Sequence, residues 1–216
     1  KDEYYFGYSV AISSDGNTIV AGAWSYDDDR GSDVGSAYVF EKAASGWPAI
    51  ATKKLIASDG YERDYFGESV AINGDTIIVG AYADDDNGGQ SGSAYVFQKT
   101  AIGWPETETK KLTAPDGAFG DRFGASVATS VDTIVVAAPR APGKAPGAGA
   151  VYVFDSKVYT LTVERVHSGG KREEVIGTTY RFYVDMVDDD DYLSAVFGNS
   201  TLPLEINAPD RIYNNP

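Results

Sequence analysis

The chain contains no cysteine and only one histidine, His167, among its 216 residues. The missing thiols exclude disulfides, cysteine-ligated zinc, iron–sulfur clusters and thiol nucleophiles. A single imidazole excludes every metal site that needs several histidines, and it leaves at most one imidazole for acid–base work. Enzyme mechanisms built on those groups are therefore not expected.

Positive charge and long apolar runs are also scarce. Lys and Arg number 18 against 32 Asp and Glu, which gives a net charge of −14 at pH 7. Nucleic acid is not expected as a partner, because phosphate neutralisation by Lys and Arg supplies most of the affinity for it. No apolar run approaches the roughly 18 residues of a membrane-spanning helix, so no transmembrane segment is expected. The composition, 43% hydrophobic and 23% charged, is that of a globular protein.

The sequence does contain one module that occurs three times. Its first block, which begins with Phe-Gly, occupies residues 6–12, 66–72 and 123–129, at spacings of 66 − 6 = 60 and 123 − 66 = 57 residues. The second block occupies residues 18–23, 76–81 and 133–138, and the third occupies residues 35–40, 92–97 and 149–154. A fourth block occurs only twice, at residues 46–55 and 103–112.

Each block is a short run rich in Val, Ile, Tyr and Phe between Gly, Asp, Asn or Pro, which predicts four strands per unit. Residues 77–79 and 134–136 are apolar on both sides of the pleat, so both faces of the sheet must be covered. Small sheets stacked face to face around an axis meet this need. We therefore predict an all-β fold of β-propeller blades, with Trp47 and Trp104 in the fourth strands.

These blocks resemble the FG-GAP repeat, the blade of integrin-alpha-type propellers and of many bacterial surface proteins. The resemblance covers residues 1 to about 155 in three copies, and the third departs from it with Ala137 where the others have Gly. Family members with integrin-like calcium loops carry Asp-x-Asp-x-Asp-Gly before the second strand. Here the corresponding hairpins, at residues 13–17, 73–75 and 130–132, are too short and too poor in carboxylates to carry that role over.

Residues 156–216 leave the register of the repeat. Alternating apolar and polar residues predict strands at 158–166 and 179–187, and two more candidates follow at 192–197 and 202–206. We predict a separate, small antiparallel β-sandwich-like module there, incomplete in this chain, with a weak resemblance to a module of secreted marine microbial proteins. A degenerate fourth blade is the alternative.

Three repeats fall short of a closed ring, because propellers usually have about four to eight blades. The chain is a piece of a longer protein, or blades of other copies complete the ring, or the array stays open with exposed edges that invite pairing. The first explanation is favoured, because Lys1 begins at a unit boundary without the strand that should precede it.

Acidic loops follow the second block in the first two copies. Calcium takes six to eight oxygen ligands on a flexible loop, and carboxylates beside a Gly supply such ligands. The predicted calcium ligands are Asp27, Asp29 and Asp33 in the first copy and Asp84, Asp86 and Asn87 in the second. In the third copy residues 140–144 have no carboxylate, so this loop is expected to be empty. The alternative is that Asp and Asn simply form turns there, and the acidic run at 188–191 is interpreted as a solvated loop.

No set of catalytic residues is evident in the sequence. A Gly-x-Ser-Val-Ala pattern similar to a nucleophile elbow begins at residues 7, 67 and 124, and its repetition indicates a scaffold role. A Ser-His-Asp triad would need His167, which lies in a polar turn outside the repeats. Asn199 begins an Asn-Ser-Thr triplet, which predicts an N-glycosylation site.

The resemblance implies a non-enzymatic binding or adhesion module, extracellular or at the cell surface, with a protein or glycan ligand, or a second copy of the chain, as its partner. The acidic loops, and not the resemblance, predict Ca²⁺ as its ion. Aromatic residues make up 12% of the chain, and they either stack on such a partner or wedge between blades. The first alternative is a structural subunit of a cell-surface filament or extracellular matrix that self-associates through exposed β edges. The second alternative is a hydrolase whose active site lies at the central opening of the propeller.

Overall fold

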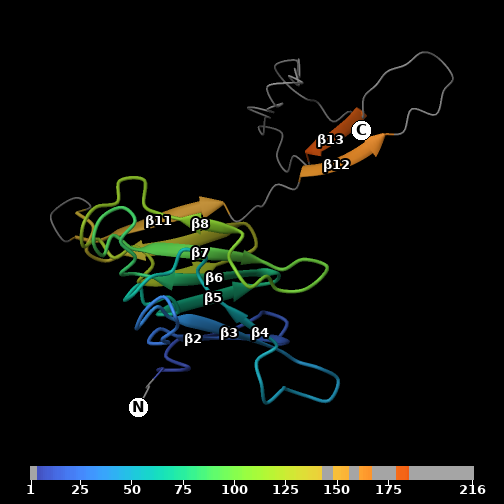
Figure 1. The fold of residues 1–216 in the computed structure, drawn as a ribbon, viewed down its shortest axis with the longest axis horizontal. Helices are drawn as coiled ribbons and strands as arrows, with labels where there is room; N and C mark the ends of the chain where they lie inside the picture. Colours follow the sequence, from blue (N-terminus) through green and yellow to red (C-terminus); the bar gives the residue numbers. More distant parts are fainter. Residues whose placement is uncertain (1–3, 143–147, 156–160, 167–178, 185–216) are drawn as a thin grey trace. The chain divides into compact units, whose positions relative to one another are not determined.

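The computed structural model describes residues 4–142, 148–155, 161–166 and 179–184, and their regular structure consists of β-strands. The chain divides into two compact units, residues 1–156 and residues 157–216, which are described separately (Figure 1). Within the described ranges, no helix has the length and apolar character that crossing a membrane requires.

The first unit contains three antiparallel sheets, one for each repeat. Blade 1 consists of β1 (Val10–Ile12), β2 (Thr18–Ala23), β3 (Ser36–Glu41) and β4 (Lys53–Leu55). Blade 2 consists of β5 (Ser69–Asn73), β6 (Thr76–Ala81), β7 (Ser93–Gln98) and β8 (Lys110–Leu112). Blade 3 consists of β9 (Ser126–Thr129), β10 (Thr133–Ala138) and β11 (Ala150–Asp155). The predicted all-β fold of FG-GAP-type blades is confirmed, with three strands in the described part of blade 3.

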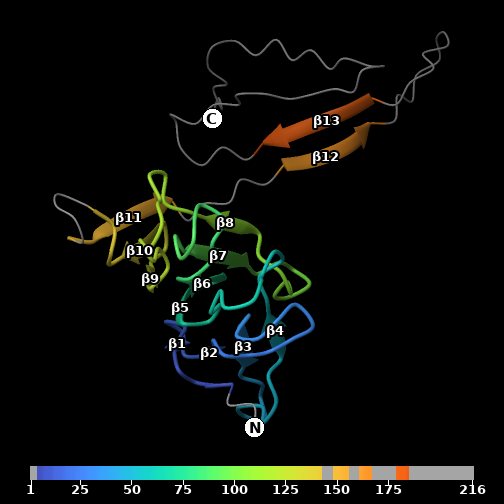
Figure 2. The same ribbon diagram turned by 60° about the vertical axis from the view of Figure 1, so that its left-hand side comes forward.

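The three sheets stack face to face, as Figures 1 and 2 show together. Strand β5 packs against β1 and β2, and β9 packs against β5 and β6. Successive residues of a strand point to opposite faces, so Ile77 and Val79 of β6 join the core shared with blade 1 while Ile78 joins the core shared with blade 3. This explains why these strands are apolar on both faces.

The two junctions between blades are built in the same way. The Ser9 hydroxyl donates a hydrogen bond of 2.8 Å to the Gly67 carbonyl across junction 1, between blades 1 and 2. The Ser69 hydroxyl donates one of 2.8 Å to the Gly124 carbonyl across junction 2, between blades 2 and 3.

The penultimate residue of the second strand is glycine in blades 1 and 2 because the next blade comes so close. A Cβ atom on Gly22 would lie 2.0 Å from the Gly67 carbonyl oxygen, and one on Gly80 would lie 2.0 Å from the Gly124 carbonyl oxygen. Any side chain at these positions would therefore push the blades apart.

The prediction for the two tryptophans is wrong in one respect. Trp47 and Trp104 lie in the loops before the fourth strands, because β4 begins only at Lys53 and β8 only at Lys110. Trp104 packs against the core of junction 1 and is 6% exposed, whereas Trp47, at the equivalent place in blade 1, is 42% exposed. The tryptophan thus covers the junction with the preceding blade.

In the second unit β12 (Leu161–Val166) pairs antiparallel with β13 (Thr179–Val184), with Leu161 opposite Val184. These strands lie where two of the four C-terminal strands are predicted. The other two, together with His167, residues 188–191 and Asn199, lie outside the described residues. The choice between a sandwich-like module and a fourth blade therefore stays a prediction.

Candidate functional site

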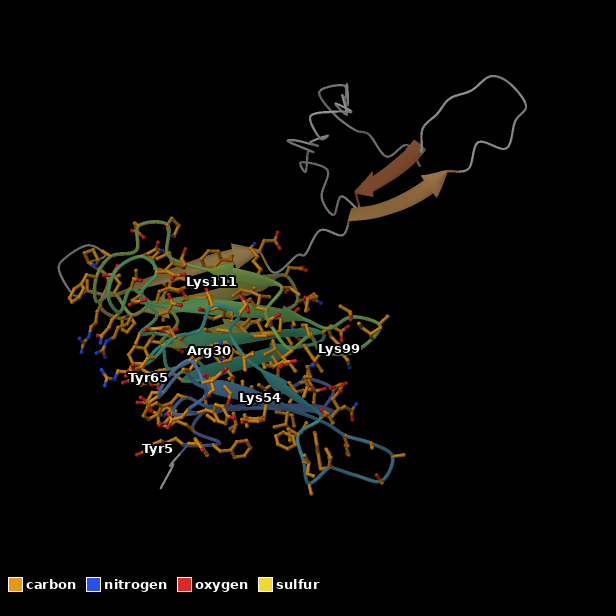
Figure 3. All side chains as sticks on the ribbon, in the orientation of Figure 1. Tyr5, Arg30, Lys54, Tyr65, Lys99 and Lys111 are labelled. Carbon is orange, nitrogen blue, oxygen red and sulfur yellow. The ribbon has the colours of Figure 1, made fainter. Side chains whose placement is uncertain are left out.

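Two groups of side chains gather at one end of the blades, which we call the loop end. It is the end at which β2, β4, β6 and β8 finish, and it carries the loops that follow them. Figure 3 shows Tyr5, Tyr65 and Lys111 toward this end and Lys99 toward the other. One group is charged and the other is aromatic.

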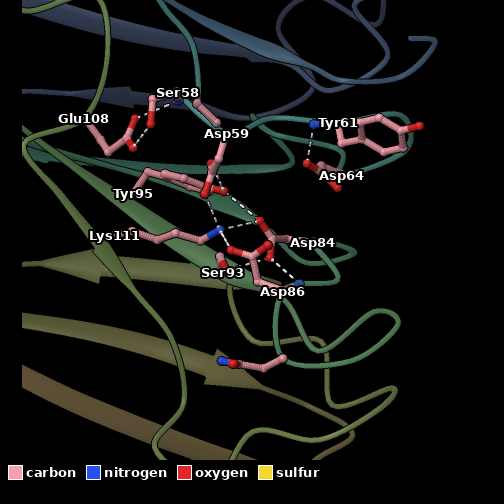
Figure 4. A network of polar contacts seen from close by, with 12 residues as sticks. Ser58, Asp59, Tyr61, Asp64, Asp84, Asp86, Ser93, Tyr95, Glu108 and Lys111 are labelled. Carbon is pink, nitrogen blue, oxygen red and sulfur yellow. Dashed lines mark hydrogen bonds and ion pairs between the residues drawn. The ribbon is translucent and has the colours of Figure 1, made fainter. Parts of the chain in front are cut away.

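The charged group, the Lys111 cluster, consists of Asp59, Asp84, Asp86, Tyr95 and Lys111 (Figure 4). The Lys111 ammonium donates hydrogen bonds of 2.7 Å to Asp59, 2.9 Å to Asp84 and 2.5 Å to Asp86. Carboxylate oxygens of these three aspartates all lie within 4.8 Å of one another. In the part of the chain that the structure describes, this is the one acidic group spaced closely enough to hold a metal ion.

Asp84 is the buried centre of the Lys111 cluster. Its Oδ2 accepts a 2.6 Å hydrogen bond from the Tyr95 hydroxyl, and its Oδ1 accepts one of 3.0 Å from the Ser93 hydroxyl. The Tyr95 hydroxyl also lies 3.0 Å from an oxygen of Asp59. Because Asp84 is only 3% exposed, these contacts replace the water that its charge would otherwise require.

The pKa shifts in the cluster follow from burial and charge pairing. Burial would lower the pKa of Lys111, but its hydrogen bonds to the three carboxylates outweigh burial and raise this pKa above its ordinary value. Burial would raise the pKa of Asp59, but the hydrogen bond and charge of Lys111 lower it instead. Burial, together with Asp84, raises the pKa of the Tyr95 phenol. Lys111 therefore stays charged at the point where the carboxylates converge.

The structure brings together two of the three calcium ligands predicted in blade 2. Asp84 and Asp86 meet in the cluster, whereas Asn87 lies outside the acidic group and donates its backbone N–H to the Ser91 hydroxyl at 3.3 Å. The third carboxylate, Asp59, was missed because it belongs to the end of the preceding repeat. A recurring Asp-Gly after the fourth block, at residues 59–60 and 116–117, is the signal that could have found it.

The Asp-Gly pair at residues 116–117, which follows the fourth block of the next repeat, makes a similar contact. Asp116 accepts a 2.7 Å hydrogen bond from the Tyr152 hydroxyl, as Asp59 lies beside the Tyr95 hydroxyl. The blade-to-blade contact between this aspartate and a tyrosine of the third strand therefore occurs at both junctions.

The calcium ligands predicted in blade 1 are not gathered in the same way. The Asp33 backbone N–H donates a 2.7 Å hydrogen bond to Asp27, and the Asp33 carboxylate accepts one from the Ser25 hydroxyl. Asp27, Asp29 and Asp33 form no group with carboxylate oxygens within 4.8 Å of one another. Calcium at these residues stays a prediction.

The place of Asp84 is taken in blade 1 by Tyr26, which makes the same turn after the second strand. The Lys54 ammonium, at the place of Lys111, lies 3.6 Å from the centre of the Tyr26 ring. A lysine at this point is thus paired with an aromatic face in blade 1 and with carboxylates in blade 2.

The aromatic group, which we call the aromatic row, consists of Tyr5, Trp24, Tyr65 and Tyr82 and ends at Arg122. Tyr5 stacks on Trp24 with ring centroids 4.8 Å apart, and the Trp24 and Tyr65 rings meet edge to face at 5.1 Å. Tyr65 stacks on Tyr82 at 5.4 Å, and the Arg122 guanidinium lies 5.1 Å from the Tyr82 ring centroid. The row therefore connects all three blades at the loop end.

Three residues of the row have a left-handed backbone. Tyr5, Tyr65 and Arg122, each directly before a Phe-Gly pair, have φ angles of 46°, 59° and 60°. This conformation costs a bulky residue about 1–2 kcal/mol, so the surroundings must hold it. Backbone N–H groups do so across the junctions, with Tyr65 donating to the Asp33 carbonyl at 3.2 Å and Arg122 to the Gln90 carbonyl at 3.1 Å.

Polar groups accompany the rings. Burial raises the pKa of Glu68, and the positive charge of Arg122 acts against this shift. The Trp24 Nε1 and Arg122 Nε atoms are buried without a hydrogen-bond partner. Half-buried rings beside a carboxyl and a guanidinium group can stack on a sugar ring or on a flat side chain of a partner and hydrogen-bond to its rim.

A scan against protein-family models finds a match to the FG-GAP repeat over residues 2–40, 51–97 and 106–154. The matched segments correspond to blades 1, 2 and 3 and make up more than half of the chain. A search of curated proteins finds no match.

Proposed function

Because the chain belongs to the FG-GAP repeat family, we propose that it is an extracellular, non-enzymatic binding or adhesion module that holds a protein or glycan partner. FG-GAP blades suggest a propeller-type binding module, and the aromatic row is the observation that carries the proposal. It lies at the loop end, and loops on a rigid scaffold are where binding residues concentrate.

The row has the properties of a contact surface. Tyrosine and tryptophan offer a large apolar area with few rotatable bonds and one polar tip, and together with arginine they dominate the energetics of interfaces. Tyr5 is 49% exposed, and Trp24, Tyr65 and Tyr82 are partly exposed. With a net charge of −14, the chain favours a neutral or basic partner over a phosphorylated or sulfated one.

The contacts of the polar groups support a non-enzymatic role. Ser9 and Ser69, which belong to the elbow-like motifs, donate their hydroxyl hydrogens to the next blade. The carboxylates of the Lys111 cluster are engaged by one ammonium ion. These groups serve the scaffold in this arrangement.

Calcium at the acidic loops belongs to the same proposal. Asp59, Asp84 and Asp86, whose carboxylate oxygens lie within 4.8 Å of one another, would supply three of the six to eight oxygens that calcium takes, and water or backbone carbonyls would supply the rest. A calcium ion at this point must displace the Lys111 ammonium, so its affinity depends on that side chain.

A binding screen with the intact chain tests the proposed function. The probes are a glycan array and a panel of purified extracellular-matrix proteins, and the variants are Tyr82→Ala and, as control, Ile102→Ala. Ile102 is 99% exposed in the loop between β7 and β8, outside the aromatic row. Tyr82→Ala should weaken binding at least tenfold with little change in melting temperature, because truncating an aromatic hot-spot residue typically costs about 2 kcal/mol or more.

Two outcomes contradict the proposal. Binding that Tyr82→Ala leaves unchanged would remove the aromatic row as its site. Turnover of polysaccharides or phosphoesters by the wild-type chain would replace the binding module by the hydrolase alternative.

A further inference from the structure

One ring in the middle of the aromatic row is positioned by a short turn. The Tyr65 ring centroid lies 5.1 Å from that of Trp24 and 5.4 Å from that of Tyr82. Tyr65 ends a turn of residues 61–65, which we call the Asp64 turn, in the loop between β4 and β5. A change in the backbone of this turn therefore reaches the centre of the row.

The Asp64 turn has a strained backbone that is held from blade 1. Arg63 and Tyr65 have left-handed φ angles of 66° and 59°, which residues with a Cβ atom disfavour. The N–H groups of both residues donate hydrogen bonds across junction 1, at 3.0 Å to the Ser32 carbonyl and at 3.2 Å to the Asp33 carbonyl. These bonds keep the turn closed against its own backbone preference.

A carboxyl group without a paired cation is buried in this turn. Asp64 is 4% exposed, and its Oδ2 accepts a 2.6 Å hydrogen bond from the Tyr61 N–H (Figure 4). Among the residues that the structure describes, no ammonium or guanidinium group lies within ion-pair distance of it. The adjacent Arg63 pairs with Glu62 instead, at 3.5 Å. Such a group favours its neutral form, because burial penalises the charged one.

Charged groups of both blades act on Asp64. Burial raises the pKa of this carboxyl to about 7, and the negative charges of Asp84 and Asp85 in blade 2 add to the rise. The backbone hydrogen bond and the Lys111 ammonium oppose the rise without cancelling it. The guanidinium of Arg30, in blade 1, is also attracted to Asp64. In the closed turn Asp64 therefore keeps its proton almost to neutral pH.

We propose that Asp64 is a proton-dependent switch of the aromatic row: its neutral form keeps the Asp64 turn closed, with Tyr65 between Trp24 and Tyr82, and its ionised form favours an open turn in which the carboxylate reaches water. Opening also releases the left-handed backbone of the turn. A partner at the row is thus held more tightly in mildly acidic solution than at neutral pH. This regulation rests on the proposed function of the row, but opening of the turn requires no ligand.

The direction of the effect follows from the pKa of Asp64 in the two forms of the turn. In the closed turn the carboxyl titrates at about 7, whereas in an open turn it would titrate near its ordinary value of 3.8. The ratio of open to closed turns therefore rises with pH between about 4 and 7, by at most tenfold per pH unit, and is constant above this range.

Hydrogen exchange of the intact chain, followed by NMR, tests the switch without any partner. The Tyr65 amide reports opening, because its hydrogen bond to Asp33 must break before it exchanges. A chelator is present, so that no calcium ion changes the charge near Asp64. After correction for the chemical exchange rate, protection of this amide should fall at least tenfold from about pH 5 to about pH 7. The amides of β6 and β7 should stay protected.

Two variants complete the test. Asp64→Asn should remove the fall in protection, because an amide side chain accepts the same hydrogen bond and stays neutral. Asp121→Asn is the matched control, since Asp121 is also 4% exposed and accepts a 2.8 Å hydrogen bond from the Ala118 N–H in the equivalent turn before blade 3. It belongs to junction 2, so Asp121→Asn should leave the pH dependence of the Tyr65 amide unchanged.

Either of two results overturns the inference. One is protection of the Tyr65 amide that stays constant over this pH range in the wild type, and the other is a fall in protection that Asp64→Asn retains. The first needs no variant, so it can be obtained even if Asp64→Asn does not fold. Both results concern the turn alone. Failure of the binding screen would remove the row as a binding site but would leave these exchange rates as they are.

Discussion

The Lys111 ammonium forms ion pairs with three carboxylates, one of which is almost wholly buried. Lys111→Met keeps most of the side-chain volume and removes the charge, so Asp84 is left buried without a counter-ion. We expect a loss of about 3 kcal/mol in urea unfolding, and we expect millimolar calcium to restore part of it. Lys53→Met is the control, because Lys53 lies 3.9 Å from the exposed Glu106 and such pairs contribute about 0–1 kcal/mol.

Calorimetric titration completes this experiment. If calcium binding releases more heat in the Lys111→Met variant than in the wild type, the result would support displacement of the ammonium by the ion. No heat and no change in melting temperature at millimolar calcium, in either protein, would remove calcium from the proposal.

Asp64 gives the molecule a pH dependence. Burial raises its pKa to about 7 from 3.8, the nearby Asp84 and Asp85 add to the rise, and a hydrogen bond from the Tyr61 N–H opposes it. The folded chain therefore holds this proton to higher pH than the unfolded chain, and the stability from Asp64 is lost as pH rises from about 4 to 7. Asp64→Asn keeps the acceptor without the charge.

We expect the stability of Asp64→Asn relative to the wild type to increase between pH 4 and pH 7, by at most about 1.4 kcal/mol per pH unit. Thermal unfolding of both proteins across this pH range measures the difference between their stabilities. A gap that does not vary with pH would mean that Asp64 titrates at its ordinary pKa in the folded protein.

At the scale of the strand, β6 depends on Gly80. Gly80→Ala would place a Cβ atom 2.0 Å from the Gly124 carbonyl oxygen and 2.3 Å from the Ser69 hydroxyl, so blades 2 and 3 must separate. We expect a loss of about 1–3 kcal/mol in urea unfolding. Gly74→Asn is the matched control, because Gly74 has φ of 53°, which Asn tolerates, and a Cβ atom on it would meet nothing within 4 Å. Equal losses in both variants would argue against the close approach as the reason for glycine.

Strand positions were predictable because each apolar block is bounded by turn residues, and because the same block recurs at the same place in each unit. The fourth strands were less predictable. The tryptophans lie in the loops before them, and the Trp104 ring covers junction 1 instead of continuing a sheet. The meeting of Asp59 with Asp84 could not be read from either repeat alone, because stacking of two blades creates it.

At the scale of the whole molecule, the size of the chain in solution separates the binding module from the structural subunit. A defined monomer in light scattering would support the binding module. Large ordered assemblies would favour subunits that pair through β edges. The same measurement with and without calcium shows whether the ion has any part in assembly.

The identical serine and glycine contacts at junctions 1 and 2 bear on how such an array can grow by gene duplication. An extra copy of the segment that encodes blade 2, inserted beside the original, would bring both a serine and a glycine and would continue the stack. An extra copy of blade 3 would place Ala137 between two blades and open the array at that point. New repeats are therefore expected to arise from blades such as blade 2 and not from blade 3.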